Sequence, residues 1–361
     1  MRTPSARSLR MLRVGRSSRL AALGLTALLA LGPFESAASP ESVPSSASAP
    51  SVLSRFNRRA WLVTGEPIPE SSAWEPSGSF RTFCGFSHLR YSDPIVYPGR
   101  RGVSHLHMFF GNTRTRARST YRSLRRWGSG TCQGGPLNRT AYWVPAMHNA
   151  AGRVVVPEYF ELYYKGFGTQ QMIRNIRTYP RGLRMIAGHD MTRRRLVRGE
   201  WSCAGGSTSV TLPRCGRGQE LRVELRFPMC WNGRQIDSAN HRRHMAYGTG
   251  GGGWITQQGG CPRTHPIHLP ELTVIVVYTS DGNTNNWYLS SDRMPGMRHA
   301  NGSTFHSDWF GAWDPAVQAT WTQECIREMR SCVWGELGNG TRLRNWLGTY
   351  RGPQLIAPPP R

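Results

Sequence analysis

Residues 272–278 read Leu-Thr-Val-Ile-Val-Val-Tyr, a short run in which both alternating sets of side chains are mostly apolar. Such a run is typical of a strand in the middle of a sheet. Residues 221–227, Leu-Arg-Val-Glu-Leu-Arg-Phe, alternate instead between apolar and polar side chains, which indicates a strand with one buried face. Residues 153–156 and 159–164 are two further strand candidates, and glycine and proline interrupt the chain every few residues.

These patterns predict a mainly β fold, a single large β-sandwich-like domain with long loops and one or two short helices. The clearest helix should run from about Pro315 to Met329, because Asp314 is a suitable N-cap and Pro315 suits the first helical position. No fixed-period repeat is present, which argues against a solenoid or a propeller.

The N-terminus has the pattern of a signal peptide. Six arginines within the first 19 residues precede an apolar run at 20–31, and we expect residues 1–38 to be removed. Residues 39–54 form a Ser/Pro/Ala-rich linker, and residues 55–361 should form one globular domain. No later window is long and apolar enough to span a bilayer, so we expect a protein without a transmembrane segment that is secreted, extracellular or held in the cell envelope.

All eight cysteines follow the predicted signal peptide, and an even number in an exported chain favours disulfides. There is no CxxC pair of the kind that holds zinc. Sequence proximity predicts local disulfides between Cys203 and Cys215 and between Cys325 and Cys332, whereas the other pairings remain open.

The chain is strongly basic, with a formal net charge of +25. Such a surface favours polyanions, including anionic wall polymers, acidic polysaccharides and nucleic acid. No nucleic-acid-binding motif accompanies the charge, so we do not expect a specific nucleic-acid partner.

Histidines that occur in tight pairs are the main functional clue. In a strand, His105 and His107 would share a face, and in a helical turn His241 and His244 would do the same. Two such pairs together form a ligand set for one divalent metal ion, zinc, copper or iron, which a nearby aspartate could complete or orient. The competing interpretation is structural, with the imidazoles bonded to loop carbonyls.

Carboxylates offer a second route to chemistry, because glycoside hydrolysis needs two of them facing one bond. The candidates, each of which also fits an arginine partner or a turn former, are Asp93, Glu158, Glu161, Asp237, Asp292 and Asp308. Aromatic candidates for stacking on sugar rings are Tyr142, Trp143 and Trp231. The chain lacks HExxH, GxSxG, P-loop and GxGxxG motifs, which argues against zincin proteases, α/β hydrolases, nucleotide hydrolases and dinucleotide enzymes.

Several segments, spread over about residues 80–315, resemble the secreted family known as domain of unknown function 1996. The segments that carry the resemblance are 93–99 (DPIVYPG), 104–112 (SHLHMFFGN), 142–145 (YWVP), 182–188 (GLRMIAG), 227–233 (FPMCWNG), 237–247 (DSANHRRHMAY), 261–266 (CPRTHP), 290–292 (SSD) and 305–308 (FHSD), with Gly311 and Trp313. The resemblance implies a secreted, mostly β, disulfide-bearing protein, often seen near carbohydrate- or wall-associated modules. Asn232, Asn240 and Arg243 depart from the family, which more often has Asp, Asp and Ser there; this weakens a carboxylate mechanism centred on His241.

Our leading hypothesis is a hydrolase- or lyase-like protein that acts on extracellular or cell-wall polysaccharide. Asp93, His107, His241 and Asp308 would be catalytic, and His105, His107, His241 and His244 would hold the metal. One cleft should then bring together seven residues: Asp93, His105, His107, His241, His244, His306 and Asp308. The alternative is a non-catalytic protein of the cell envelope that binds carbohydrate or an anionic polymer, and a third hypothesis makes the histidines part of the scaffold.

Overall fold

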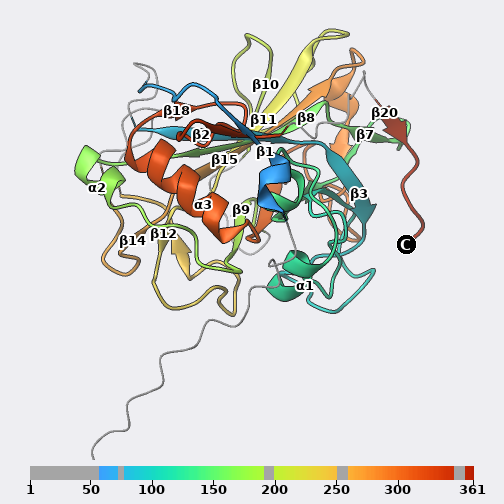
Figure 1. Cartoon of the computed structure of the whole chain (residues 1–361). Coiled ribbons are helices and arrows are strands. Elements are labelled where there is room, and N and C mark those ends of the chain that lie inside the picture. Colours follow the sequence, from blue (N-terminus) through green and yellow to red (C-terminus); the bar gives the residue numbers. More distant parts are fainter. Residues whose placement is uncertain (1–56, 72–76, 191–198, 250–258, 345–353) are drawn as a thin grey trace, which may run out of the picture. The chain divides into compact units, whose positions relative to one another are not determined.

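A six-stranded sheet forms one layer of the fold (Figure 1). This computed structural model describes residues 57–71, 77–190, 199–249, 259–344 and 354–361, so the predicted signal peptide and linker lie outside the described residues. In spatial order the strands are β10 (Glu200–Cys203), β11 (Glu220–Arg226), β15 (Glu271–Thr279), β8 (Tyr159–Lys165), β2 (Ser79–Cys84) and β18 (Ser331–Cys332). β18 is parallel to β2, and the other pairs are antiparallel.

The predicted central strand is confirmed. β15 pairs with β11 on one side and with β8 on the other, and eight of its nine residues are buried. β11 alternates between buried and half-buried residues, as the period-two pattern of residues 221–227 predicts. Both faces of β15 are thus buried, whereas β11 has one buried apolar face and one outward-facing polar face.

A five-stranded antiparallel sheet forms the second layer. Its strands, in spatial order, are β3 (Phe86–Arg90), β4 (His107–Gly111), β5 (Ala141–Pro145), β17 (His306–Phe310) and β9 (Arg184–Gly188). Its inner face packs on the first sheet: the rings of Phe110 and Phe160 stack with centroids 4.3 Å apart, and the hydroxyls of Tyr142 and Tyr164 are hydrogen-bonded at 3.0 Å. The two sheets enclose the main core, which confirms the β-sandwich-like expectation.

The opposite face of the five-stranded sheet is also covered. Phe109, Trp143, Ile186 and Phe310 alternate with the inward residues of their strands and form a second apolar cluster, against which Ile95 packs from the segment between β3 and β4. This outer face of β4 and β17 is where the polar residues described below lie.

Shorter strands form three small sheets at the edges. They are β13 (Met245–Ala246), β12 (Cys230–Trp231) and β14 (Ile267–His268); β16 (Tyr288–Leu289), β6 (Met147–His148), β7 (Val154–Val156) and β20 (Gln354–Ile356); and β1 (Leu62–Thr64) with β19 (Thr341–Leu343).

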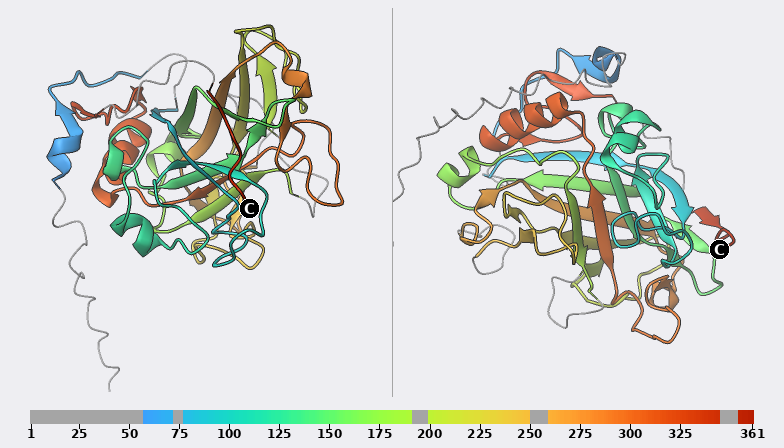
Figure 2. Two further views of the ribbon diagram at one scale, coloured as in Figure 1. Left: turned by 90° about the vertical axis from the view of Figure 1, so that its right-hand side faces the viewer. Right: turned by 90° about the horizontal axis from the view of Figure 1, so that it is seen from below.

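The described residues include three α-helices, α1 (Tyr121–Arg126), α2 (Gln170–Arg174) and α3 (Pro315–Trp321), and α3 continues as a π-helix over Thr322–Arg327. The predicted helix start is confirmed: the Asp314 carboxylate accepts hydrogen bonds from the amides of Ala316 and Val317. α3 runs alongside β2 (Figures 1 and 2). The rings of Trp321 and Phe80 stack with centroids 5.0 Å apart. α1 and α2 are too short to show helical periodicity in the sequence. None of the described helices is long and apolar enough to cross a membrane.

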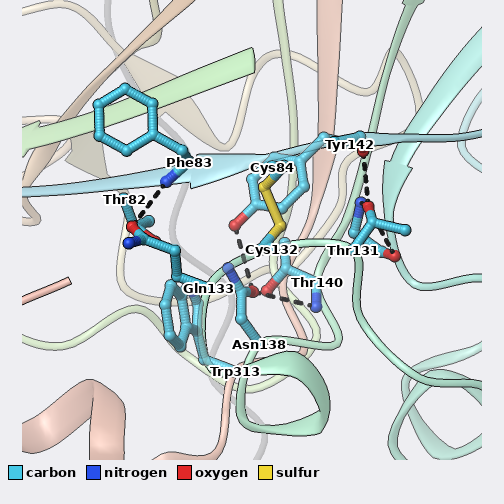
Figure 3. Close-up of a disulfide and its surroundings, with 12 residues drawn as sticks. Thr82, Phe83, Cys84, Thr131, Cys132, Gln133, Asn138, Thr140, Tyr142 and Trp313 are labelled. Atoms are coloured by element: carbon cyan, nitrogen blue, oxygen red, sulfur yellow. Dashed lines mark hydrogen bonds between the residues drawn. A yellow bond between two sulfur atoms is a disulfide. The ribbon is translucent and has the colours of Figure 1, made fainter. Parts of the chain in front are cut away.

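Four disulfides link all eight cysteines. Both predicted local pairs are present, and the other two are Cys84–Cys132 and Cys230–Cys261. Figure 3 shows Cys84–Cys132 tying the end of β2 to a loop whose Gln133 side chain accepts a hydrogen bond from the amide of Phe83.

Candidate functional site

A cavity of about 410 Å³ opens beside the outer face of the five-stranded sheet. Its volume lies within the roughly 300–1,000 Å³ typical of small-molecule sites. Six of the seven residues expected to converge line this cleft, and His244 does not; the six are Asp93, His105, His107, His241, His306 and Asp308.

Strand alternation explains much of this convergence. His306 and Asp308 are two residues apart in β17 and so point to the same face, while the intervening Ser307 points inward. His107 begins β4, and His105 lies just before that strand, so only one of the two residues is in a strand. Their rings nevertheless lie with centroids 4.1 Å apart.

Asp93 reaches the cleft from the turn that follows β3. One of its carboxylate oxygens accepts hydrogen bonds from the amides of Ile95 at 2.9 Å and Val96 at 2.8 Å. These bonds hold the side chain against its own backbone, an arrangement typical of aspartate in turns. The same turn buries Ile95 and so fixes the carboxylate over the sheet.

Three imidazoles form a compact group. One nitrogen each of His105, His107 and His306 lies within 4.8 Å of the other two. The ring of His306 lies 5.0 Å from that of His105 and 5.8 Å from that of His107, centroid to centroid. This spacing lets one metal ion meet all three rings.

Hydrogen bonds determine which nitrogen carries the hydrogen in two of the rings. Nδ1 of His107 lies 3.0 Å from the carbonyl oxygen of Ser92, and Nδ1 of His306 lies 2.9 Å from that of Thr304. A carbonyl oxygen can only accept, so both Nδ1 atoms donate and both Nε2 atoms keep a lone pair in the neutral ring. Metal-binding histidines are commonly oriented in this way.

His105 follows the same logic through a weaker contact. Its Nδ1 lies 3.4 Å from the hydroxyl oxygen of Ser290, which donates its own hydrogen to the carbonyl of Leu106 at 2.6 Å. The hydroxyl oxygen is therefore available to Nδ1 only as an acceptor. All three rings accordingly present an unprotonated Nε2.

The rings resist protonation. Burial, together with the neighbouring His306, lowers the pKa of His105 to about 3. Burial also lowers the pKa of His306 to about 4, and burial and the other two imidazoles hold the pKa of His107 well below 6.5. The group is thus neutral at pH 7, as a metal ligand must be.

A carboxylate pair lies beside the imidazoles. Asp93, His107 and Asp308 each offer a ligand atom within 4.8 Å of the others, and all three side chains are buried. Three buried atoms, both carboxylate oxygens of Asp308 and Nε2 of His107, have no hydrogen-bond partner among the described residues. Buried polar atoms of this kind are rare without a ligand or water.

The pair cannot hold two negative charges without compensation. Burial raises the pKa of Asp308 well above its usual range, and the nearby Asp93 raises it further. Burial also raises the pKa of Asp93, although hydrogen bonds from the Val96 and Ile95 amides act in the opposite direction. One oxygen of Asp93 lies within 4.8 Å of one oxygen of Asp308. The geometry therefore suits a shared proton or a shared cation better than two independent carboxylates.

His241 lines the cleft on a strained backbone. Its φ of 56° lies in the left-handed region, and its Nδ1 is 2.9 Å from the carboxylate of Asp237, which also pairs with Arg184 at 2.8 Å. Strain of this kind often marks functional positions. His241 belongs to neither group of potential ligands, and its predicted metal-ligand and catalytic roles both stay predictions.

His244, the fourth predicted metal ligand, does not line the cleft and belongs to neither group of potential ligands. Residues 241–244 form turns rather than a helix, so the two histidines do not share a face. His244 is fully buried, with Nδ1 3.1 Å from the Ser238 hydroxyl and Nε2 2.6 Å from the carbonyl of Arg184. Both nitrogens are occupied, and the structural interpretation holds for this residue.

The three proposed sugar-stacking residues do not line the cleft. Tyr142 and Trp143 have no exposed surface: Tyr142 faces the interior between the sheets, and Trp143 packs on Phe109 beneath the site. Trp231 is partly exposed, but its indole nitrogen donates to the carbonyl of Gln235 at 2.6 Å. Because both rings are buried, neither Tyr142 nor Trp143 can stack on a sugar in this structure. The sequence could not show this, since strand alternation alone does not tell a buried ring from an exposed one.

The other candidate carboxylates form structural contacts within the fold. Glu161 pairs with Arg81, and Glu158 accepts from the Thr279 hydroxyl. Asp292 is fully buried and accepts hydrogen bonds from the amides of residues 289, 302 and 304.

Sequence reasoning missed Arg242, which also lines the cleft. Its guanidinium donates to the carbonyls of Ile186 and His189, each at 3.2 Å, and lies 3.4 Å from the Asp190 carboxylate. Its charge opposes the raised pKa of Asp308. The segment 237–247 was singled out, but nothing in it distinguished this arginine from the many others.

The family comparison matches the central part of the chain. The family model described as domain of unknown function (DUF1996) matches residues 93–313, slightly less than the 80–315 expected from the motifs. No curated protein and no solved structure matches.

Proposed function

The chain belongs to the family named domain of unknown function DUF1996, and we propose that it is a metal-dependent hydrolase or lyase that acts on extracellular or cell-wall polysaccharide. The observation that carries the proposal is the meeting of three neutral imidazoles, each with an unprotonated Nε2, and a buried aspartate pair in one cleft. Four disulfides support an extracellular or envelope location for this activity.

The donor set fits a divalent transition metal. Imidazole nitrogens suit zinc, copper and iron, whereas magnesium and calcium prefer oxygen ligands. His107 would be the common ligand, because it belongs to both potential ligand groups and its Nε2 is not engaged by the Ser92 carbonyl that holds Nδ1. A bound dication would also offset the charge of Asp308, whose two carboxylate oxygens have no hydrogen-bond partner among the described residues.

The residues around the metal can move a proton. A metal of this kind polarises a substrate oxygen as a Lewis acid. Asp93 and Asp308, whose pKa values burial raises, could hold one proton between them and deliver it to a leaving oxygen. His241, held by Asp237, stands at the cleft wall as a second proton carrier. Hydrolysis and β-elimination both need such transfers.

Metal content tests the proposal. Mature protein purified without an affinity tag should hold one zinc, copper or iron ion per chain by elemental analysis. His107→Ala should lose it, because His107 belongs to both ligand groups. His244→Ala, with folding checked by circular dichroism, is the matched control and should keep it. Wild-type protein that takes up none of the three metals would refute metal dependence.

Activity separates the two reaction types. A hydrolase acting on a panel of neutral and acidic polysaccharides releases reducing ends only, whereas a lyase also creates unsaturated ends that absorb ultraviolet light. Asp308→Asn should reduce turnover without removing all metal, because the three imidazoles remain. Binding of a polysaccharide with no bond cleavage in metal-loaded protein would instead favour the non-catalytic envelope protein.

A further inference from the structure

Charge is unevenly distributed along the chain. Residues 94–157 contain ten arginines and no aspartate or glutamate. Arg125 is buried in an ion pair with Asp314, and the Arg139 guanidinium donates to the carbonyl of Arg125. Most of the remaining arginines of this stretch are exposed, so this part of the surface carries positive charge without acidic residues of its own.

A second, smaller cavity lies within this stretch. It measures about 150 Å³ and is lined by Asn112, Arg114, Arg116, Ser123, Leu124 and Trp127. The Asn112 amide donates to the carbonyls of Leu124 at 3.0 Å and Trp127 at 2.9 Å, which fixes the walls relative to each other. The side chain of Trp127 is half exposed, with 50% of its surface accessible.

Three arginines at or next to this cavity have no side-chain partner among the described residues. Residues 114, 116 and 118 are exposed and alternate with the buried residues 115 and 117. No ion pair or side-chain hydrogen bond joins the guanidinium of Arg114, Arg116 or Arg118 to another of the described residues. Their donors are available to a ligand, in contrast to those of Arg184 and Arg242, which are held by aspartates.

The same surface adjoins the cleft. The amide of Gly99 donates to the carbonyl of Ala117 at 2.8 Å, so the segment that carries Arg116 and Arg118 lies against the turn after Asp93. Tyr97, in that turn, lines the cleft, and the Arg100 guanidinium lies 5.8 Å from the centre of its ring. Exposed arginines thus extend from the Trp127 cavity to the cleft.

We infer that Trp127, Arg114, Arg116, Arg118 and Arg100, here called the arginine track, bind an anionic polysaccharide and lead it to the cleft. This inference rests on the proposed function, whose substrate class it narrows to polymers with carboxylate-bearing sugars. Guanidinium forks match carboxylates in bidentate geometry, and an exposed indole stacks on the apolar face of a sugar ring. Carboxylates repeated along such a polymer fit arginines repeated along a surface.

The track suits a polysaccharide better than single-stranded nucleic acid. Nucleic-acid grooves combine basic residues with several aromatic rings on which successive bases stack. Trp127 is the one aromatic side chain in the lining of the small cavity, whose other walls are short polar groups, arginines and a leucine. A single stacking ring with neighbouring amide and hydroxyl groups is better matched to one sugar unit.

Binding of polygalacturonate in the presence of a metal chelator tests the track. The triple variant Arg114→Gln/Arg116→Gln/Arg118→Gln should bind on the order of 100-fold more weakly at low salt, if each arginine contributes roughly fivefold, as basic residues do at anionic membrane surfaces. The difference should shrink as salt screens the exposed charges. Trp127→Ala should weaken binding at every salt concentration, because stacking is not screened.

A matched control removes equal charge elsewhere. Arg214→Gln/Arg217→Gln/Arg234→Gln changes three exposed arginines on other loops and should retain nearly full affinity. Equal losses in the two triple variants would overturn the inference, because net charge alone would then explain binding. Single-stranded DNA that binds as tightly as polygalacturonate, with the same dependence on Arg114, Arg116 and Arg118, would overturn the polysaccharide assignment. Metal content measured on the same samples reports separately on the proposed function.

Discussion

Acid should destabilise the metal-free protein through the cleft histidines, and His306 allows the effect to be calculated. Its pKa is about 4 in the folded protein, against 6.5 for the unperturbed group. Between these values the unfolded chain binds a proton that the folded chain does not, so stability falls as pH falls from 6.5 towards 4. At pH 4.5 the expected cost is roughly 3 kcal/mol, at 1.36 kcal/mol for each pH unit, or about 2 kcal/mol after allowance for solvent in the cleft.

The measurement is urea unfolding followed by tryptophan fluorescence at pH 7.0 and pH 4.5 with a chelator present. In His306→Gln, the loss of unfolding free energy between the two pH values should be smaller than in wild type by about 2 kcal/mol, for the same linkage reason. Ser104→Ala alters a buried, non-titrating residue of the same cleft and should leave this difference unchanged. Equal losses in wild type and His306→Gln would refute the claim that the folded site excludes the proton.

Two further predictions concern the scaffold. Asp314→Ala should lower the unfolding free energy by about 4 kcal/mol in urea titrations, because it removes the cap of α3 and leaves the buried Arg125 without its ion pair. Arg58→Gln removes only a half-exposed partner of Asp314 and should cost at most about 1 kcal/mol. Equal effects would contradict this ranking. Cys84→Ala/Cys132→Ala should cost about 4 kcal/mol by chain entropy, since the disulfide closes a separation of 48 residues. Loss of Cys325–Cys332, with a separation of 7, should cost only about 2.4 kcal/mol, and thermal and urea unfolding under oxidising conditions would check both values.

Local signals predicted the fold well. The alternation of residues 221–227 and the continuous apolar run of 272–278 identify β11 and β15, because side-chain period and burial are set by neighbours in the chain. Asp314 and Pro315 mark the start of α3 for the same reason. The pairing of Cys84 with Cys132 depends on how β2 and a distant loop meet, which no local pattern encodes.

The candidate site was predictable in part. Histidine and aspartate motifs pointed to six residues that line one cleft. Such motifs are informative because clustered titratable side chains occur mainly at functional sites. His241 and His244 would share a face in a helical turn, but the left-handed backbone at residue 241 turns the chain, and His244 lies outside the cleft. Arg242 was missed because its place in the cleft is fixed by carbonyls of β9 and the loop after it, a tertiary contact.

The two faces of β17 connect the cleft to the core through a single strand. His306 and Asp308 look into the cleft, whereas Trp309 lies in the main core, packed on Tyr179 with ring centroids 4.8 Å apart. Inserting or deleting one residue would exchange the two faces, placing an indole in the cleft and a carboxylate among buried rings. Natural relatives of this protein should therefore keep the length of β17, and loop grafting intended to change specificity should leave this strand intact.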